Sequence, residues 1–271
     1  MHATPRFPAT FVPHGGGPWP VLSLPMMDDA EGAKLADGMR DIARGPGRAP
    51  AFLVVVSAHW ETRNVAVHTG SAPGMYYDYG GFPPEAYTLK WPAPGAPEQG
   101  EQAIELLRKA GFTVDVEKAR GYDHGVFIPL MLAWPQANVP VVQVSLKVGL
   151  DPAEHLAIGR ALAPLRDLGG YLIGSGNSYH NLRRIFRPDD TARAESKAFG
   201  DWLDAAVTAP PTERDRLLAD WMSAPAARAA HPREEHLIPL MVVAGAAGAD
   251  VGRVSWRGTM AGLQLSAHAF G

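Results

Sequence analysis

Five of the ten histidines in this 271-residue chain stand in settings that favour chemistry. They are spread along the sequence at His14, His59, His124, His180 and His236. His14, His59 and His180 each follow a short apolar run that is typical of a buried strand. In an open α/β sheet, ligands bind outside the carboxyl ends of the strands, so these three imidazoles are expected to share one edge.

Imidazoles that meet at such an edge are suited to holding a metal ion. Two histidines and one carboxylate form the facial site of non-haem Fe(II) oxygenases, whereas three imidazoles suit catalytic zinc. Glu235 and His236 are adjacent, roughly 100° apart on a helix, so only one of them would face a given ion. No local motif of the His-Glu-x-x-His kind fixes the choice, and a lone histidine is more often a hydrogen-bonded structural residue.

The elements that would position these side chains begin with several strands. Buried strands are predicted at 10–12, 51–56, 139–146 and 171–173, and weaker strand patterns lie at 112–116 and 263–269. The run at 51–56 has no alternation of polar and apolar residues, which is typical of a strand covered on both faces.

Helices are predicted between the strands, and this alternation indicates an α/β fold. The helical patterns cover 97–110, 151–169, 192–207, 212–222 and a segment from about 232 to 243. Asp151, Pro152 and Glu154 form a strong helix start, whereas Pro164 and Pro239 are positions where a kink is expected. The Gly-, Pro- and Tyr-rich stretch at 71–97 is too long for a plain connection, and such loops often shape a site.

Composition limits the classes of protein that the chain can represent. Apolar residues make up 46% and charged residues 20%, which argues against disorder. The net charge is −3 without a basic block, so no nucleic-acid or membrane partner is expected. The absence of cysteine excludes disulfides and thiolate chemistry. Because residues 1–20 lack a signal-peptide pattern and no apolar run is long enough to span a bilayer, we expect a cytoplasmic protein.

Other segments match functional motifs only in part. The segment at 174–177 is similar to part of a phosphate loop, but it lacks the lysine and the full glycine pattern. Ser57 and Ser178 lack the nucleophile elbow of an α/β-hydrolase. The remaining histidines without a special setting are assigned to surface or structural positions: His2, His68, His155 and His268.

Taken in order, these segments resemble the class III extradiol ring-cleavage dioxygenases, most closely the DOPA-dioxygenase-type branch. The matching pieces are VPHG at 12–15, VVVSAHW at 54–60, YDYGGFP at 77–83, YDHG at 122–125, PVVQVS at 140–145, GSGNSYHNL at 174–182 and EHLIPL at 235–240. The resemblance implies one catalytic domain over residues 1–271. It also implies an α/β fold whose mostly parallel central sheet is flanked by helices, with the metal site at the strand carboxyl ends.

The resemblance implies a ligand set for that metal. His14 and His59 match metal ligands of the family, and the third ligand would come from Glu235 or His236. The wider class uses a carboxylate there, whereas the DOPA-type branch points to the histidine, so His236 is favoured and Glu235 is the rival. The implied cofactor is Fe(II) for activity, with zinc as an alternative bound ion.

The resemblance also implies the reaction and its partners. A catechol-type aromatic diol and O2 would react to give a ring-opened semialdehyde. His180 matches the acid/base residue beside the metal, and His124 matches a histidine that faces substrate or oxygen. Further residues expected around the pocket are Asp123, Asn177 and those at 76–79.

Several alternatives stay open at this point. After the first His-Gly, the branch usually continues Ser-Pro-Met, whereas this chain has Gly16-Gly17-Pro18-Trp19, which puts the choice of catechol in doubt. A zinc hydrolase or a vestigial binding protein on the same scaffold would use the same residues. A homo-oligomer is also open. Candidates to meet a substrate carboxylate are Arg63, Lys90, Arg120, Arg183 and Arg184.

Overall fold

One sheet of eight strands crosses the part of the protein that the computed structural model describes, residues 6–44 and 47–271. The strands are β1 (Ala9–Pro13), β2 (Phe52–Thr62), β3 (Val65–His68), β4 (Val114–Glu117), β5 (Val141–Lys147), β6 (Gly170–Gly176), β7 (Gly252–Met260) and β8 (Leu263–Phe270). Their order is β4-β3-β5-β2-β6-β1-β8-β7. The central strands β5, β2, β6 and β1 are mutually parallel, and β3, β8 and β7 each join a neighbour in antiparallel pairing. This arrangement confirms the predicted α/β class.

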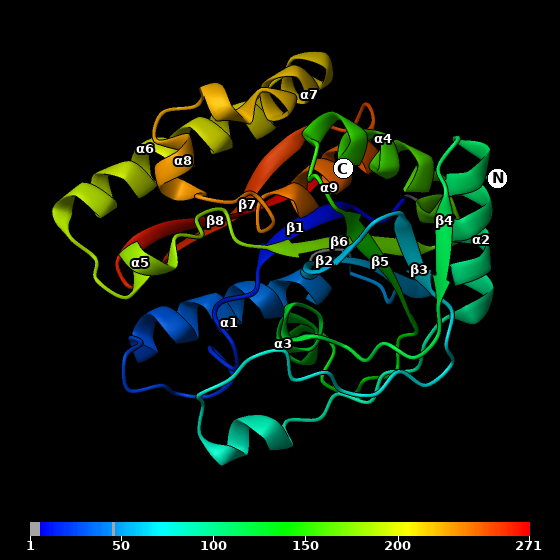
Figure 1. Cartoon of the computed structure of the whole chain (residues 1–271), viewed down its shortest axis with the longest axis horizontal. Helices are drawn as coiled ribbons and strands as arrows, with labels where there is room; N and C mark the ends of the chain where they lie inside the picture. Colours follow the sequence, from blue (N-terminus) through cyan, green and yellow to red (C-terminus); the bar gives the residue numbers. More distant parts are fainter. Residues whose placement is uncertain (1–5, 45–46) are drawn as a thin grey trace.

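Helices cover both faces of the sheet (Figure 1). They are α1 (Asp29–Arg44), α2 (Pro97–Lys109), α3 (His124–Ala133), α4 (Pro152–Leu162), α5 (Leu182–Ile185), α6 (Asp190–Thr208), α7 (Pro211–Ala219), α8 (Ala227–Ala230) and α9 (Ile238–Ala247), with 3-10 turns η1 (Pro84–Thr88), η2 (Ala163–Leu168) and η3 (Trp221–Ser223). Helices α1 and α3 pack together on one face, whereas α2, α4, α6 and α9 cover the other. No helix in the described ranges has the length and apolar character needed to cross a membrane.

The core lies where the central strands meet α9. Each side chain of β5 except the last is buried, as expected for a parallel strand covered on both faces. All ten residues of α9 are buried, so this helix is apolar on every side. It packs against α4 at two glycines: a Cβ on Gly159 would lie 2.0 Å from the Val242 carbonyl oxygen, and one on Gly245 equally close to that of Leu156. Only glycine permits this approach of the two helix backbones.

Several predicted boundaries differ from the structure. The helix expected over 151–169 begins as predicted, with the Asp151 carboxylate accepting from the Glu154 backbone N–H at 2.7 Å. It ends at Leu162 and continues as η2 from Ala163, with Pro164 in the first turn of η2. The helix expected from 232 begins only at Ile238, because Pro239 occupies its first turn and does not kink it. The helix expected over 212–222 ends at Ala219. Elements without a prediction include α1, α3, α5, β3 and β7.

The strand prediction also misplaced His59. Strand β2 was expected to end at 56, yet it continues to Thr62, so His59 lies inside the strand. Pairing of β2 with β5 shifts register between Val56 and Glu61, and this irregularity lies directly around the histidine. His14 follows β1 and His180 follows β6, as expected. Of the histidines assigned to surface or structure, His68, His155 and His268 are buried, and His2 lies outside the described residues.

Candidate metal centre

Four imidazoles from separate parts of the chain meet at one edge of the sheet. His14 comes from the end of β1, His59 from β2, His124 from the first residue of α3, and His236 from the segment before α9. The ring centroids of His59 and His124 are 4.0 Å apart, those of His14 and His59 4.9 Å, and those of His14 and His236 5.1 Å. Three of these side chains, His14, His59 and His124, place one ring nitrogen each within 4.8 Å of the others.

The orientation of His14 depends on a proline in helix α3, through a hydrogen-bonded serine on β6. Pro129 lies inside α3 and has no N–H, so it leaves the carbonyl of Gly125 without its helical donor. Ser175 on β6 donates its hydroxyl to that carbonyl. The Ser175 Oγ can then only accept from His14 Nδ1, 3.0 Å away, which makes Nδ1 the protonated nitrogen. The Nε2 lone pair of His14 therefore faces the other imidazoles.

One carboxylate orients two of the imidazoles. Asp78 Oδ1 accepts from both the backbone N–H and the Nδ1 of His124 at 2.9 Å, and Asp78 Oδ2 lies 3.3 Å from His59 Nδ1. Burial opposes ionisation of Asp78, but its hydrogen bond from His124 and the nearby His59 hold its pKa below the ordinary value. The bond to Asp78 therefore places the proton of His124 on Nδ1, and the nearby carboxylate favours the same tautomer for His59.

A second carboxylate orients His236 and His180. Glu235 Oε1 accepts from His236 Nδ1 at 2.9 Å and lies 3.3 Å from His180 Nδ1. The rings of His180 and His236 are stacked, with centroids 3.4 Å apart and planes at 17°. The loop reaches this position because Gly176 has no side chain: a Cβ there would lie 2.0 Å from the His236 carbonyl oxygen. The same carbonyl accepts from the Asn177 backbone N–H at 3.0 Å.

Two facing ring nitrogens provide a test of whether the site fits a cation. His14 Nε2 and His59 Nε2 are 3.1 Å apart, and the His14 ring already donates from Nδ1 to Ser175, so its Nε2 carries a lone pair. Burial lowers the pKa of His59 to about 3 and the pKa of His14 well below its ordinary value, so both rings are neutral and available as ligands. Metal–nitrogen bonds of about 2.1 Å let two ligands of one ion approach this closely. The donor set therefore fits a divalent transition metal.

Two side chains that orient the imidazoles were not named individually in the sequence analysis. Asp78 was included only within the range 76–79, and Ser175 only as part of a motif. The signal for Asp78 was the long Gly/Pro/Tyr-rich loop around it, which lies against α3. Asn177 and Asp123 act on the backbone: the Asn177 amide binds Gly15, and the Asp123 carboxylate caps α3 by accepting from the Val126 N–H at 3.2 Å.

A cavity of about 430 Å³ opens onto the imidazoles. Five of the six predicted site residues line it directly: His14, His59, His124, His180 and His236. Glu235 does not line it and lies behind His236 and His180. None of the five cationic residues proposed to meet a substrate carboxylate lines it either.

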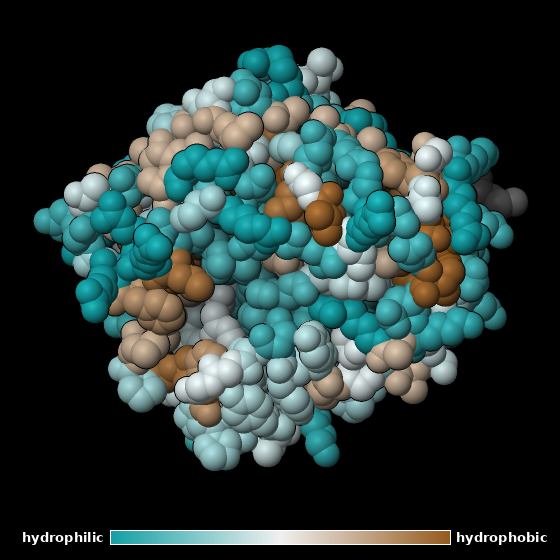
Figure 2. Space-filling model, viewed as in Figure 1, coloured by the Kyte–Doolittle hydropathy of each residue, from teal (hydrophilic) through white to brown (hydrophobic). Residues whose placement is uncertain are grey.

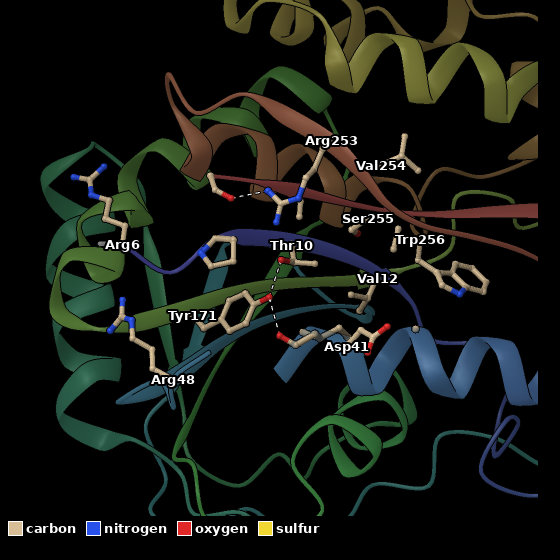
Figure 3. A pocket seen from close by; sticks show the side chains of 16 residues that line it. Arg6, Thr10, Val12, Asp41, Arg48, Tyr171, Arg253, Val254, Ser255 and Trp256 are labelled. Carbon is tan, nitrogen blue, oxygen red and sulfur yellow. Dashed lines mark hydrogen bonds between the residues drawn. The ribbon is translucent and has the colours of Figure 1, made fainter. Parts of the chain in front are cut away.

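A second cavity, of about 600 Å³, lies along the other part of β1 (Figure 3). Its wall combines residues of β1, α1 and the β7–β8 hairpin, and the Tyr171 hydroxyl bonds Thr10 Oγ1 and the Ile42 carbonyl there. It is lined by no histidine. Neither of the two groups of described side chains that could hold a metal, His14, His59 and His124 or His180, Glu235 and His236, lies in it. The chemistry of the sequence motifs is therefore confined to the first cavity.

Known proteins share the sequence pattern and the fold of this chain. Residues 9–267 match the family described as the catalytic LigB subunit of aromatic ring-opening dioxygenase. A 4,5-DOPA dioxygenase extradiol from Beta vulgaris is 39% identical over 216 residues, covering 78% of this chain and 80% of that protein. Dioxygenase tasH from Hapsidospora irregularis is 36% identical over 263 residues, covering 92% and 80%. The crystal structure of an uncharacterized protein, JW3007 from Escherichia coli K12, superimposes with a TM-score of 0.79 at 29% identity and covers 98% of this chain and all of that one.

Proposed function

The chain belongs to the LigB family of aromatic ring-opening dioxygenases, and from this membership we propose that it opens the ring of a catechol-type substrate. It is an extradiol dioxygenase of the DOPA-dioxygenase branch, an oxidoreductase that uses O2. In the proposed reaction the ring opens next to the two hydroxyl groups and yields a semialdehyde. The observation that carries the proposal is the convergence of four imidazoles at one cavity, three of which bind a side-chain partner through Nδ1.

We propose that His14, His59 and His236 hold the ion. The bond from His236 Nδ1 to Glu235 supports the histidine as third ligand and the carboxylate as the group that orients it. We propose Fe(II) as the active ion and zinc as one that competes for the site, because imidazole suits both and zinc lies higher in the affinity order. A reducing compartment keeps iron in the Fe(II) state, which supports the cytoplasm as the site of action.

When bound, Fe(II) supplies a centre that gathers both hydroxyl oxygens and O2 and lowers the pKa of a hydroxyl. His180 is proposed to take the second phenolic proton on Nε2 and return it later, since its Nδ1 is engaged by Glu235. His124, fixed through Nδ1 on Asp78, presents Nε2 to the substrate side of the pocket.

Anaerobic reconstitution tests the proposal. The purified protein is stripped of metal, reloaded with Fe(II) or with Zn(II), mixed with catechols, and then exposed to oxygen. We expect stoichiometric oxygen uptake and the visible absorbance of a semialdehyde with Fe(II) only. No oxygen uptake with any catechol, with Fe(II) shown to be bound, would overturn the ring-opening reaction and shift weight to a zinc hydrolase. Metal binding without turnover of any catechol would favour a vestigial binding protein.

A further inference from the structure

The wall of the metal pocket opposite the imidazoles is strongly apolar. Its side chains are aliphatic, thioether or aromatic: Leu24, Met26, Met27, Phe82, Leu182, Ile185, Phe186 and Met260. Apart from the histidines, the described residues that line the pocket include no side chain that carries a charge. Methionine and phenylalanine adapt to apolar ligands of irregular shape. The pocket therefore offers a substrate apolar contact everywhere except at the metal end.

This apolar wall continues to the surface. Met26 is 68% exposed, Phe186 59% and Leu182 52%, although all three are large hydrophobic residues. Figure 2 shows hydrophobic surface gathered over α5, the element that carries Leu182 and Ile185. Single exposed hydrophobic residues are ordinary, but a group of them around the mouth of a catalytic pocket indicates a ligand-binding surface.

The mouth leads into a further cavity. That outer cavity has a volume of about 650 Å³ and shares four lining residues with the metal pocket: Met26, Met27, Ile185 and Phe186. These four residues form an apolar collar between the two cavities. Beyond the collar, the rim of the outer cavity carries the charged side chains of Asp28, Glu31 and Arg193. A ligand that enters the collar thus passes from the imidazoles through apolar contacts before it reaches charged groups.

We propose, resting on the ring-opening function above, that the substrate is a catechol with an extended apolar substituent. The diol lies at the imidazoles, and the substituent lies against Ile185 and Phe186 and emerges through the collar. Only beyond Met26 and Met27 does the substituent meet polar surroundings.

The absence of a counter-charge supports this substrate class. A short carboxylate or amino-acid side chain on the catechol would be placed within the apolar collar, where an unpaired charge is costly to bury. Two cationic residues near the site are already engaged elsewhere. Arg120 donates to the Asp123 carboxylate at 2.8 Å, and Arg184 lies 3.1 Å from that of Asp189. Neither of them lines the pocket.

A series of 4-alkylcatechols tests the proposal. Methyl-, butyl- and hexylcatechol and 3,4-dihydroxyphenylacetate are titrated calorimetrically into the zinc-loaded protein, which gives Kd without turnover. The same compounds are then assayed as substrates of the Fe(II) enzyme. Each methylene that enters the collar is expected to lower Kd roughly fourfold, and kcat/KM is expected to rise in parallel. The carboxylate compound should bind more weakly than methylcatechol.

A variant tests whether the dependence of binding on alkyl chain length arises at the collar. Phe186→Ala removes an exposed side chain, so folding should survive, and it should reduce the hexyl-to-methyl preference about tenfold. Leu168→Ala, at a 54% exposed residue outside both cavities, is the matched control and should keep the preference. Cleavage of methylcatechol without any gain for longer chains would overturn the inference and leave the proposed function standing. A gain in binding without cleavage of any compound would instead overturn the proposed reaction.

Discussion

At the scale of single residues, the partners of the Nδ1 atoms determine what the imidazoles can do. Ser175, Asp78 and Glu235 each accept from an Nδ1 of the cluster. Every imidazole so engaged keeps its Nε2 lone pair for the centre of the site. Such outer partners fix the tautomer and raise the basicity of a ligand, so their loss weakens metal binding without removing a ligand.

Asp78→Asn tests this orienting role. The amide keeps the size of the side chain but removes the charge that faces His59 and His124. We expect metal affinity to fall roughly 10- to 100-fold, measured by competition with a chromogenic chelator. Asp37→Asn, which changes an exposed carboxylate paired with Arg40, is the control. Unchanged affinity in the Asp78 variant would show that the tautomers are held by other contacts.

Replacing His180 or His14 by alanine should have two different effects, one on turnover and the other on metal binding. His14→Ala removes a proposed ligand, so the protein should lose its metal. His180→Ala should retain metal, because its proposed role is proton transfer, and should lose turnover by roughly 10²- to 10⁴-fold. Metal content by elemental analysis, measured beside oxygen uptake, separates the two. Equal metal content and normal turnover in both variants would contradict these roles.

At the scale of elements, the site depends on close approach between α3, β2 and β6. Gly125, the second residue of α3, is the point of contact: its carbonyl binds Ser175, and a Cβ on it would lie 2.5 Å from Ser57 Oγ and 3.0 Å from His59 Cδ2. The start of this helix therefore lies directly behind one imidazole and carries another, His124.

Gly125→Ala should disturb both imidazoles at once. The added methyl group has no free space, so we expect a loss of about 1–3 kcal/mol in the free energy of unfolding and a weaker metal site. Gly74→Ala is the control, because a Cβ there meets nothing within 4 Å. Urea denaturation and chelator competition measure the two effects. If Gly125→Ala keeps the wild-type free energy of unfolding and metal affinity, α3 can shift to accept the methyl group without destabilising the protein.

The elements also show what sequence alone could predict. The central strands and the ends that carry His14 and His180 were predictable, because apolar runs identify buried strands. Helix α3 was missed because HGVFIP carries a proline and no helical periodicity, and its start depends on the Asp123 cap. The partners Asp78 and Ser175 come from a loop and a distant strand. Their contact with the histidines depends on tertiary packing, which local patterns do not encode.

At the scale of the whole molecule, buried neutral histidines link stability to pH. His231 is fully buried, donates from Nε2 to the Ser178 carbonyl and packs against Phe199 and Trp221. Burial lowers its pKa to about 3, with smaller effects from the charged or titratable groups His180, Glu235 and Arg228. The unfolded chain binds this proton near pH 6.5, whereas the folded chain does not. Stability from this residue is therefore complete above pH 6.5 and falls progressively towards pH 3.

His231→Gln should make that decline shallower. Glutamine can still donate to the Ser178 carbonyl but does not titrate, so the slope of unfolding free energy against pH should fall by about 1.4 kcal/mol per pH unit. Urea denaturation of the metal-free protein at pH 4.5, 5.5 and 6.5 measures it. Parallel slopes for wild type and variant would show that His231 does not control acid stability.

The strand order has a consequence for when the site can be assembled in the cell. Strand β1, which leads into His14, lies between β6 and β8, so its neighbours are synthesised about 160 and 260 residues later. Ala9 pairs with Phe270, the last residue but one of the chain. The sheet around β1 is therefore complete only after β6 and β8 have joined it. Because these partners lie so far along the sequence, the four imidazoles are expected to converge late in folding and not through local contacts.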